Sequence, residues 1–157
     1  MHVDVDLIQR YNRPLPRYTS YPTAPHFTTN VGADAFQEEV QASNTEATEP
    51  LSLYVHLPFC QQLCYYCGCH MKITHDPERI ARYLTHLKRE IDTVSAALHP
   101  DREVVQVHWG GGTPTYLSAH QIEALGTHLR DRFRIADNAE IGLEADPRTL
   151  TEAKVAA

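Results

Sequence analysis

The chain has 157 residues, of which 42% are hydrophobic and 22% are charged, and its formal net charge is −6. This composition is typical of a globular protein and excludes an intrinsically disordered chain. The negative charge argues against a general nucleic-acid binder, which usually carries a basic surplus. No apolar run approaches the ~20 residues that span a bilayer, and the N-terminus reads as lacking a signal peptide. We therefore expect a cytoplasmic protein with no nucleic-acid or membrane partner.

The first third of the chain has the pattern of an arm and a linker. Residues 1–32 contain several prolines and show no clean periodicity, which predicts irregular backbone with one short helical turn. A short helix is predicted over residues 33–42, and the polar run SNTEATEP at 43–50 is typical of a linker. We therefore expect an N-terminal arm and linker at residues 1–50, followed by one domain, itself cut short, at residues 51–157.

A regular alternation of strands and helices begins at residue 51. Apolar and β-favouring residues predict strands over 51–57, 103–109 and 139–145. Helical spacing predicts helices over about 76–98 and 118–133, the first opened by an Asp-Pro pair and the second by a Ser-x-x-Gln capping box. The order of these elements argues for a parallel α/β sheet with helical crossovers.

Three unusual segments follow the predicted strands. They are the cysteine-bearing loop, the Gly-Gly-Gly-Thr-Pro run at 110–114, which is predicted to break its strand, and the Glu-Ala-Asp-Pro run at 144–147. Ligands of parallel α/β folds collect at the carboxyl ends of the strands, so these segments are expected to form a site. The last residues, 151–157, open a further helix without a stop signal, and the chain therefore looks cut short.

All four cysteines lie in one loop, with the spacing Cys60-x3-Cys64-x2-Cys67 and Cys69 two residues further on. In a cytoplasmic protein, such crowding favours metal binding over a disulfide framework. A structural zinc site usually takes two ligand pairs separated by ~12 residues or more, although a nearby histidine could complete such a site here. Three thiolates on one loop can instead bind three irons of a cubane and leave the fourth iron open for a small molecule.

The Cys-x3-Cys-x2-Cys spacing after a strand resembles the signature of the radical S-adenosylmethionine (SAM) superfamily. The flanking residues 54–60 (YVHLPFC) and 64–69 (CYYCGC) are similar to one subgroup, the oxygen-independent coproporphyrinogen III oxidases. Residues 16–22 (PRYTSYP), 108–117 (HWGGGTPTYL) and 144–147 (EADP) resemble the same family in the same order. A sister group of haem chaperones shares the cysteine segment. Those chaperones usually have aspartate and phenylalanine after the third cysteine and lack the PRYTSYP arm.

The resemblance implies an α/β fold that contains the first βα units of an incomplete (β/α)6 radical-SAM barrel, preceded by an irregular N-terminal arm. It implies oxidative decarboxylation of coproporphyrinogen III to protoporphyrinogen IX in anaerobic haem biosynthesis. The chain matches about the first third of the family's length, so we expect the isolated fragment to be inactive. The full-length enzyme is expected to be a monomer that needs an electron donor. A haem chaperone and a non-catalytic iron–sulfur or zinc module stay open as alternatives.

The resemblance assigns a 4Fe–4S cluster to Cys60, Cys64 and Cys67. Cys69 matches a cysteine that the family keeps without using it as a ligand, and we interpret it as a small buried thiol near the cluster. Substrate carboxylates need cationic partners, and arginine is the usual bidentate partner for a carboxylate. Arg17, in the arm, is therefore a candidate for binding the substrate, although exposed arginines in an irregular arm are usually only solvated.

The family binds two SAM molecules, and the resemblance implies two sets of binding residues. The set for the molecule on the cluster is Tyr54, Gly111 and Glu144, and the set for the second molecule is Tyr66, Gly112 and Thr113. Taken alone, the glycine run could be a tight turn and Glu144 could be a surface acid. The histidines His56, His70 and His108 flank the expected site, but the sequence assigns them no role.

Overall fold

The computed structural model describes residues 4–12, 22–46 and 49–157. By compactness the chain divides into two units, Met1–Phe36 and Gln37–Ala157. The functional division at residue 50 stays a prediction. Within the described residues, no helix is both long enough and apolar enough to cross a membrane.

The described part of the first unit is helical. Helix α1 spans Val5–Tyr11 and begins at the N-cap residue Asp4, whose side chain accepts a hydrogen bond from the backbone of the first turn. A short 3-10 helix covers Ala24–His26, and α2 covers Ala33–Ser43, across the boundary between the units. Both helices that the sequence predicts in this part are confirmed. The candidate substrate residue Arg17 lies outside the described residues.

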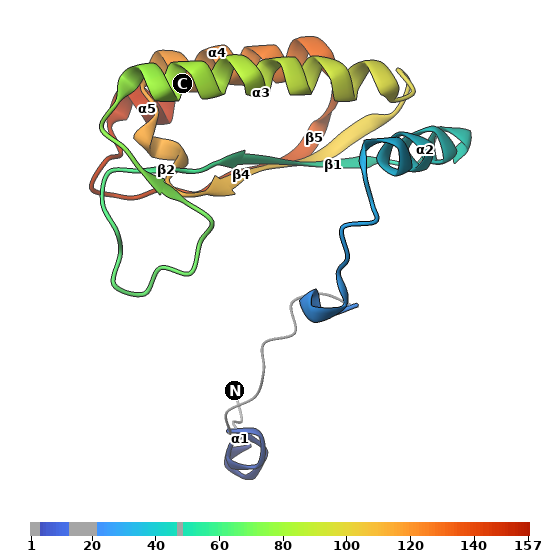
Figure 1. The fold of residues 1–157 in the computed structure, drawn as a ribbon. Coiled ribbons are helices and arrows are strands. Elements are labelled where there is room, and N and C mark those ends of the chain that lie inside the picture. Colours follow the sequence, from blue (N-terminus) through green and yellow to red (C-terminus); the bar gives the residue numbers. More distant parts are fainter. Residues whose placement is uncertain (1–3, 13–21, 47–48) are drawn as a thin grey trace. The chain divides into compact units, whose positions relative to one another are not determined.

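The second unit is built on a three-stranded parallel sheet in the order β1-β4-β5. Its two long helices lie side by side over one face of that sheet (Figure 1). The strands are β1 Leu51–Leu57, β4 Glu103–Gly111 and β5 Arg134–Leu143. The crossover helices are α3 Pro77–Ala97 and α4 Ala119–Arg132. The predicted α/β alternation and the parallel sheet are therefore confirmed.

Both crossover helices begin where the sequence predicts. The Asp76 carboxylate accepts hydrogen bonds from two backbone N–H groups of the first turn of α3, and Pro77 occupies the first helical position. Ser118 and Gln121 form the predicted capping box of α4, with distances of 2.9 and 3.2 Å. Such caps satisfy backbone N–H groups that have no partner within the helix.

The sheet differs from the prediction at the glycine run and near the cysteines. Strand β4 does not break at Gly110, because Gly110 and Gly111 still pair with the last residues of β1. Strand β5 begins earlier than predicted, at Arg134. A second, two-stranded parallel sheet, β2 Phe59–Cys60 with β3 Lys72–Ile73, closes the base of the cysteine loop. Two residues a strand are too few for a periodic signal, so the sequence predicts only a loop there.

Three short helical elements complete the second unit. They are the 3-10 helices Asn44–Glu46 and Pro114–Tyr116 and the last helix, α5, Glu152–Ala156. Helix α5 lies where the sequence predicts that a further helix begins.

The hydrophobic core lies between the sheet and the two long helices. Its most enclosed members are Leu57 on β1, Val104 on β4, Leu117 before α4 and Leu125 on α4. Successive strand residues point to opposite faces of a sheet. The residues that alternate with the core positions, including Tyr54 and His108, therefore lie on the opposite face.

Candidate functional site

The carboxyl ends of the strands and the cysteine loop enclose a cavity of about 600 Å³. Three segments form it: the loop from the end of β2 to residue 69, the turn after β4, and the segment 144–148 after β5. In Figure 1 the cysteine loop leaves the sheet at β2 as a long excursion and returns before α3. Of the residues predicted for the site, the cavity is lined by Cys60, Cys64, Tyr66, Cys67, Gly112, Thr113 and Glu144.

Of the three motif cysteines, one lies on a strand and two lie on a turn. Cys60 is buried in β2, and its Sγ lies 3.3 Å from the Thr113 hydroxyl. Cys64 and Cys67 are half-buried on one turn, in which the N–H of Cys67 donates to the carbonyl of Cys64 at 3.1 Å. Cys69 is exposed, so the interpretation of Cys69 as a buried thiol is wrong.

The thiols form a suitable donor set for an iron–sulfur cluster. Thiolates are soft ligands that bind iron–sulfur clusters well, and the three motif cysteines and Cys69 all line one cavity from one loop. Across the described residues, no three His, Cys, Asp or Glu side chains are already grouped as a metal site. The fit therefore rests on the chemistry of the donor set and on the cavity that the three thiols share.

The glycine run joins the end of β4 to the end of β1 and to β2. The N–H of Gly112 donates to the carbonyl of Leu57, and the N–H of Thr113 donates to the carbonyl of Phe59, both at 2.9 Å. A Cβ on Gly112 would lie 2.7 Å from the carbonyl carbon of Pro58. Because that neighbour is backbone and cannot swing away, the position requires glycine.

Gly111 is also restricted, by its conformation and by a histidine. Its φ of +115° is strained for other residues, and a Cβ there would lie 2.6 Å from the His56 ring. His56 is itself fixed, because its Nε2 lies 2.9 Å from the carbonyl of His70 and its Nδ1 lies 3.2 Å from the Tyr54 hydroxyl. Since a carbonyl only accepts, Nε2 of His56 is the donor to the carbonyl of His70.

Glu144 connects β4 with the segment that follows β5. One carboxylate oxygen accepts from the N–H of Gly111 at 3.2 Å, and the other lies 3.3 Å from Nε2 of His108. The His108 ring stacks on Tyr54, with ring centroids 6.0 Å apart and planes within 12°. Desolvation, and then the negative charge of Glu144, raise the pKa of Tyr54. The structure thus gathers Tyr54, Gly111 and Glu144 around two histidines.

The residues predicted to bind a second SAM molecule, Tyr66, Gly112 and Thr113, are less closely connected to one another. Gly112 and Thr113 are consecutive in the turn after β4, and Thr113 also contacts Cys60. Tyr66 lines the same cavity from the cysteine loop, but its side chain is 91% exposed and makes no hydrogen bond within the described residues. The three residues therefore line one cavity, but within the described residues no hydrogen bond joins Tyr66 to Gly112 or Thr113.

The structure contains an ion pair at the cavity wall that the sequence did not predict. The Arg148 guanidinium binds the Asp146 carboxylate at 2.7 Å and approaches the Cys64 Sγ at 3.9 Å. Its hydrogen bonds lower the pKa of Asp146 below the usual range of an aspartate. The segment after the third strand was singled out in the sequence, but nothing in it indicated that Arg148 would reach a cysteine 84 residues away.

The histidines also contribute more than the sequence indicated. His56 occupies the space against which Gly111 closes, and His108 holds the Glu144 carboxylate. A signal was present, because Tyr54, His56 and His108 alternate with core residues on their strands and therefore share the face opposite the helices.

Comparison with known proteins identifies the class of this fold and site. Residues 54–157 match the model of the radical SAM superfamily, and this range runs from β1 to the last residue. The chain therefore belongs to the radical SAM superfamily.

Its relatives define the family more narrowly. An oxygen-independent coproporphyrinogen III oxidase of Salmonella typhimurium is 49% identical over 147 residues, which are 94% of this chain and 31% of that protein. One of Mannheimia haemolytica is 49% identical over 144 residues, which are 92% of this chain and 96% of that sequence. The chain is a member of the oxygen-independent coproporphyrinogen III oxidase family. It spans about a third of the length of most curated relatives that it matches.

A solved structure supports the same assignment. Coproporphyrinogen III oxidase from Escherichia coli, described as a radical SAM enzyme, superposes on 94% of this chain with a TM-score of 0.79 and 42% sequence identity. The matched part is 32% of that structure. The fold is accordingly part of a radical SAM barrel, as the sequence predicts.

Replacing Gly112 by alanine should destabilise the second unit, because the new Cβ would force the Pro58 backbone to move. We expect a loss of about 1–3 kcal/mol in the free energy of unfolding, the usual cost of backbone strain at such sites. Urea denaturation followed by circular dichroism measures it. Gly68→Ala in the cysteine loop is the matched control, since its Cβ would meet no atom within 4 Å. Equal effects of the two variants would contradict the prediction.

Proposed function

We propose that this chain is the cluster- and SAM-binding part of an enzyme that oxidatively decarboxylates coproporphyrinogen III to protoporphyrinogen IX. The observation that carries the proposal is the shared cavity, in which three motif cysteines face Gly112, Thr113 and Glu144. The names of the relatives supply the substrate. The whole protein would act as a monomer in the cytoplasm, with a separate electron donor and with no nucleic-acid or membrane partner.

Cys60, Cys64 and Cys67 would hold a 4Fe–4S cluster, which when bound supplies the electron for reductive cleavage of SAM. Cys60 is the ligand that the fold orients, because β2 and the Thr113 hydroxyl restrain its side chain. Cys64 and Cys67 lie on a turn within the loop, and the Arg148 guanidinium approaches the Cys64 Sγ from the segment after β5. Cys69 is exposed and lines the same cavity, but it is not proposed as a ligand.

Glu144 is the residue best placed to bind the ammonium group or ribose hydroxyls of SAM. Each carboxylate oxygen already accepts one hydrogen bond, from Gly111 or from His108, which fixes the orientation of the side chain. A carboxylate oxygen has a further lone pair, so Glu144 can still accept from a ligand. Tyr54 is held beside it by the His108 ring. We propose that Tyr54, Gly111 and Glu144 bind the SAM molecule on the cluster.

A second SAM molecule would be bound by Tyr66, Gly112 and Thr113. Gly112 leaves room because it has no side chain, and Thr113 offers a hydroxyl beside Cys60. The exposed ring of Tyr66 is free to pack against an adenine or a methyl group. Arg17 is proposed as a partner for a substrate carboxylate, since a guanidinium binds carboxylates with two hydrogen bonds.

Anaerobic reconstitution with iron and sulfide should give a broad absorption shoulder near ~400 nm, as thiolate-bound clusters do. Replacing Cys60, Cys64 or Cys67 by alanine should abolish the shoulder, because each removes a proposed ligand. Cys69→Ala, in the same loop, should retain it. Loss of the shoulder in Cys69→Ala, with retention in one of the other three variants, would show that the ligand set is wrong.

Glu144→Gln should weaken SAM binding about ten- to a hundredfold, because a hydrogen bond to a charged group contributes about 1.5–3 kcal/mol. The measurement is a SAM titration of the reduced cluster by electron paramagnetic resonance, whose spectrum changes when SAM binds the open iron. Glu140→Gln is the matched control, since Glu140 is an exposed acid on β5 outside the cavity. Equal affinities for the two variants would remove Glu144 from the site.

The decarboxylation itself is tested in a chimera in which this chain replaces the matching third of the Escherichia coli relative. With reductant, SAM and coproporphyrinogen III under anaerobic conditions, the chimera should form protoporphyrinogen. The same chimera with Cys64→Ala should form none. A chimera that binds its cluster and cleaves SAM but leaves coproporphyrinogen III unchanged would contradict the proposed substrate.

A further inference from the structure

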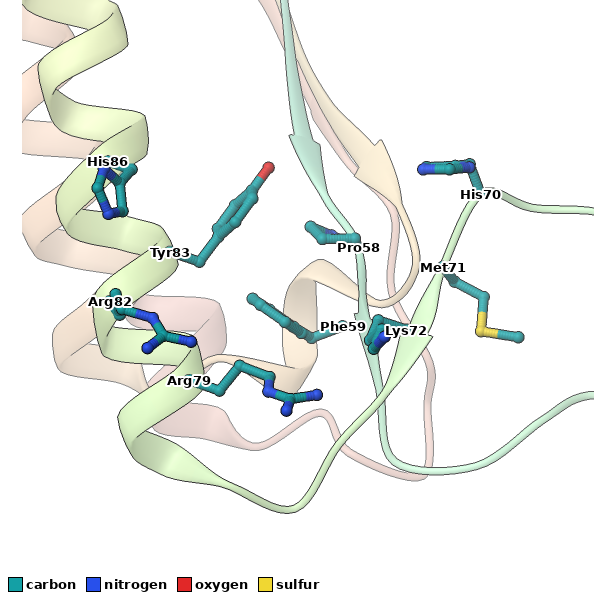
Figure 2. A pocket seen from close by; sticks show the side chains of 9 residues that line it. All are labelled: Pro58, Phe59, His70, Met71, Lys72, Arg79, Arg82, Tyr83 and His86. Atoms are coloured by element: carbon teal, nitrogen blue, oxygen red, sulfur yellow. The ribbon is translucent and has the colours of Figure 1, made fainter.

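A second cavity, of about 680 Å³, lies between α3 and the β2–β3 ribbon (Figure 2). Nine residues line it: Pro58, Phe59, His70, Met71, Lys72, Arg79, Arg82, Tyr83 and His86. Figure 2 shows Arg79 and Arg82 extending from α3 toward Phe59, with Lys72 on the other side of that ring. No function described above uses this cavity.

Within the described residues, the cations of this cavity have no ion-pair partner. Lys72, Arg79 and Arg82 are exposed, and within the described residues none of them forms an ion pair. The lining contains no acid among the described side chains, although the net charge of the chain is −6. Arg79 also lies in the first turn of α3, where the helix dipole disfavours a positive charge. Helix stability therefore does not explain the positive charge at Arg79.

Below the cations the cavity is apolar and rigid. The Phe59 ring is buried and meets the Tyr83 ring edge-on, with centroids 5.2 Å apart. The Tyr83 hydroxyl donates to the carbonyl of His56 at 2.7 Å, which holds α3 against the end of β1. An occupant would thus bury apolar groups on a preformed surface and meet positive charge at the rim.

The ribbon places this cavity beside the proposed cluster site. Phe59 and Cys60 are consecutive residues of β2, so their side chains point to opposite faces. Phe59 lines the basic cavity, and Cys60 lines the cavity of the cysteine motif. The N–H of Lys72 donates to the carbonyl of Pro58 at 2.6 Å, and the N–H of Thr74 donates to the carbonyl of Cys60 at 3.2 Å. The hydrogen-bonded backbone of the β2–β3 ribbon therefore separates the basic cavity from the cavity of the cysteine motif.

We propose that the basic cavity is the docking surface for an acidic redox protein that reduces the cluster. The inference rests on the proposed function, in which one electron is consumed for each SAM that is cleaved. One electron leaves the reduced low-potential centre of the donor and enters the cluster, and no bond forms or breaks in this transfer. The donor is oxidised by one electron and the cluster is reduced by one electron.

The exposure of the cations favours a protein over a small anion. A small-molecule site usually encloses the few polar groups that orient its ligand. Here Lys72, Arg79 and Arg82 stand exposed around an apolar centre. Exposed charge around an apolar centre is the anatomy of a protein interface, and it accelerates the encounter with an oppositely charged partner.

The first test measures binding without the cluster. The probe is a fluorescently labelled flavodoxin, a small acidic protein that carries flavin mononucleotide, and the readout is fluorescence anisotropy with the apo chain at low salt. Arg79→Glu/Arg82→Glu should weaken binding at least tenfold, and added salt should weaken binding to the unmutated chain. Arg89→Glu/Arg130→Glu is the matched control, because it makes the same charge change at exposed arginines outside the cavity. It should bind within about twofold of the unmutated chain.

The second test measures electron delivery in the reconstituted chain by the bleaching of cluster absorbance in a stopped-flow instrument. Reduction by flavodoxin should be at least tenfold slower in Arg79→Glu/Arg82→Glu than in the control, whereas reduction by dithionite should be equal in both. Equal binding and equal flavodoxin rates in the two variants would overturn the docking surface and leave the proposed function intact. A cluster that dithionite cannot reduce even in the unmutated chain would instead count against the proposed function. Tight binding of citrate by the chain, with none of flavodoxin, would identify a small-anion site and also overturn the proposal.

Discussion

The close approach of Gly112 to the backbone that follows β1 is the contact on which the candidate site depends. The Gly112 N–H reaches the carbonyl of Leu57, and a side chain at this position would collide with Pro58. The next residue, Thr113, is thereby placed where its N–H meets Phe59 and its hydroxyl meets the Cys60 thiol. One missing side chain therefore sets both the turn after β4 and the direction of the first cysteine.

The same end of the sheet organises the polar side of the cavity. A parallel sheet brings the carboxyl ends of its strands to one edge, and there Glu144 accepts from the backbone of Gly111. His108 holds the other carboxylate oxygen and stacks on Tyr54. These groups are partly exposed, so their hydrogen bonds add little to stability. Their contribution is preorganisation, since a ligand would meet a carboxylate whose orientation is already restricted.

The sequence predicted those features that local chemistry determines. Asp76 and Ser118 cap α3 and α4 where their residue types indicated, and the spacing of the cysteines located the cavity. The continuation of β4 through Gly110 was not predictable, because glycine disfavours strands and only pairing with β1 keeps it there. Hydrogen bonds between residues far apart in the chain were also not predictable. An example is the contact of His108 with Glu144, which lie 36 residues apart.

The exposure of Cys69 was likewise not predictable from local sequence. Its neighbour Cys67 is half-buried on a turn that a local hydrogen bond defines, whereas the exposure of Cys69 depends on the path by which the loop returns to β3. No pattern in a stretch that contains four cysteines and a glycine specifies that path. Sequence reasoning therefore located the cavity that the cysteines line but not the environment of each thiol.

The β2–β3 ribbon has a functional consequence that exceeds its size. Two residues a strand contribute little to stability, yet the ribbon closes the base of the cysteine loop and fixes both of its ends. Because side chains alternate along β2, Cys60 belongs to one cavity and Phe59 to the other. Any group that contacts Phe59 thus lies one residue from a proposed cluster ligand without entering the SAM cavity. In the proposed arrangement a donor would approach the cluster from this side and SAM from the other, so reduction and SAM binding would not compete for one opening.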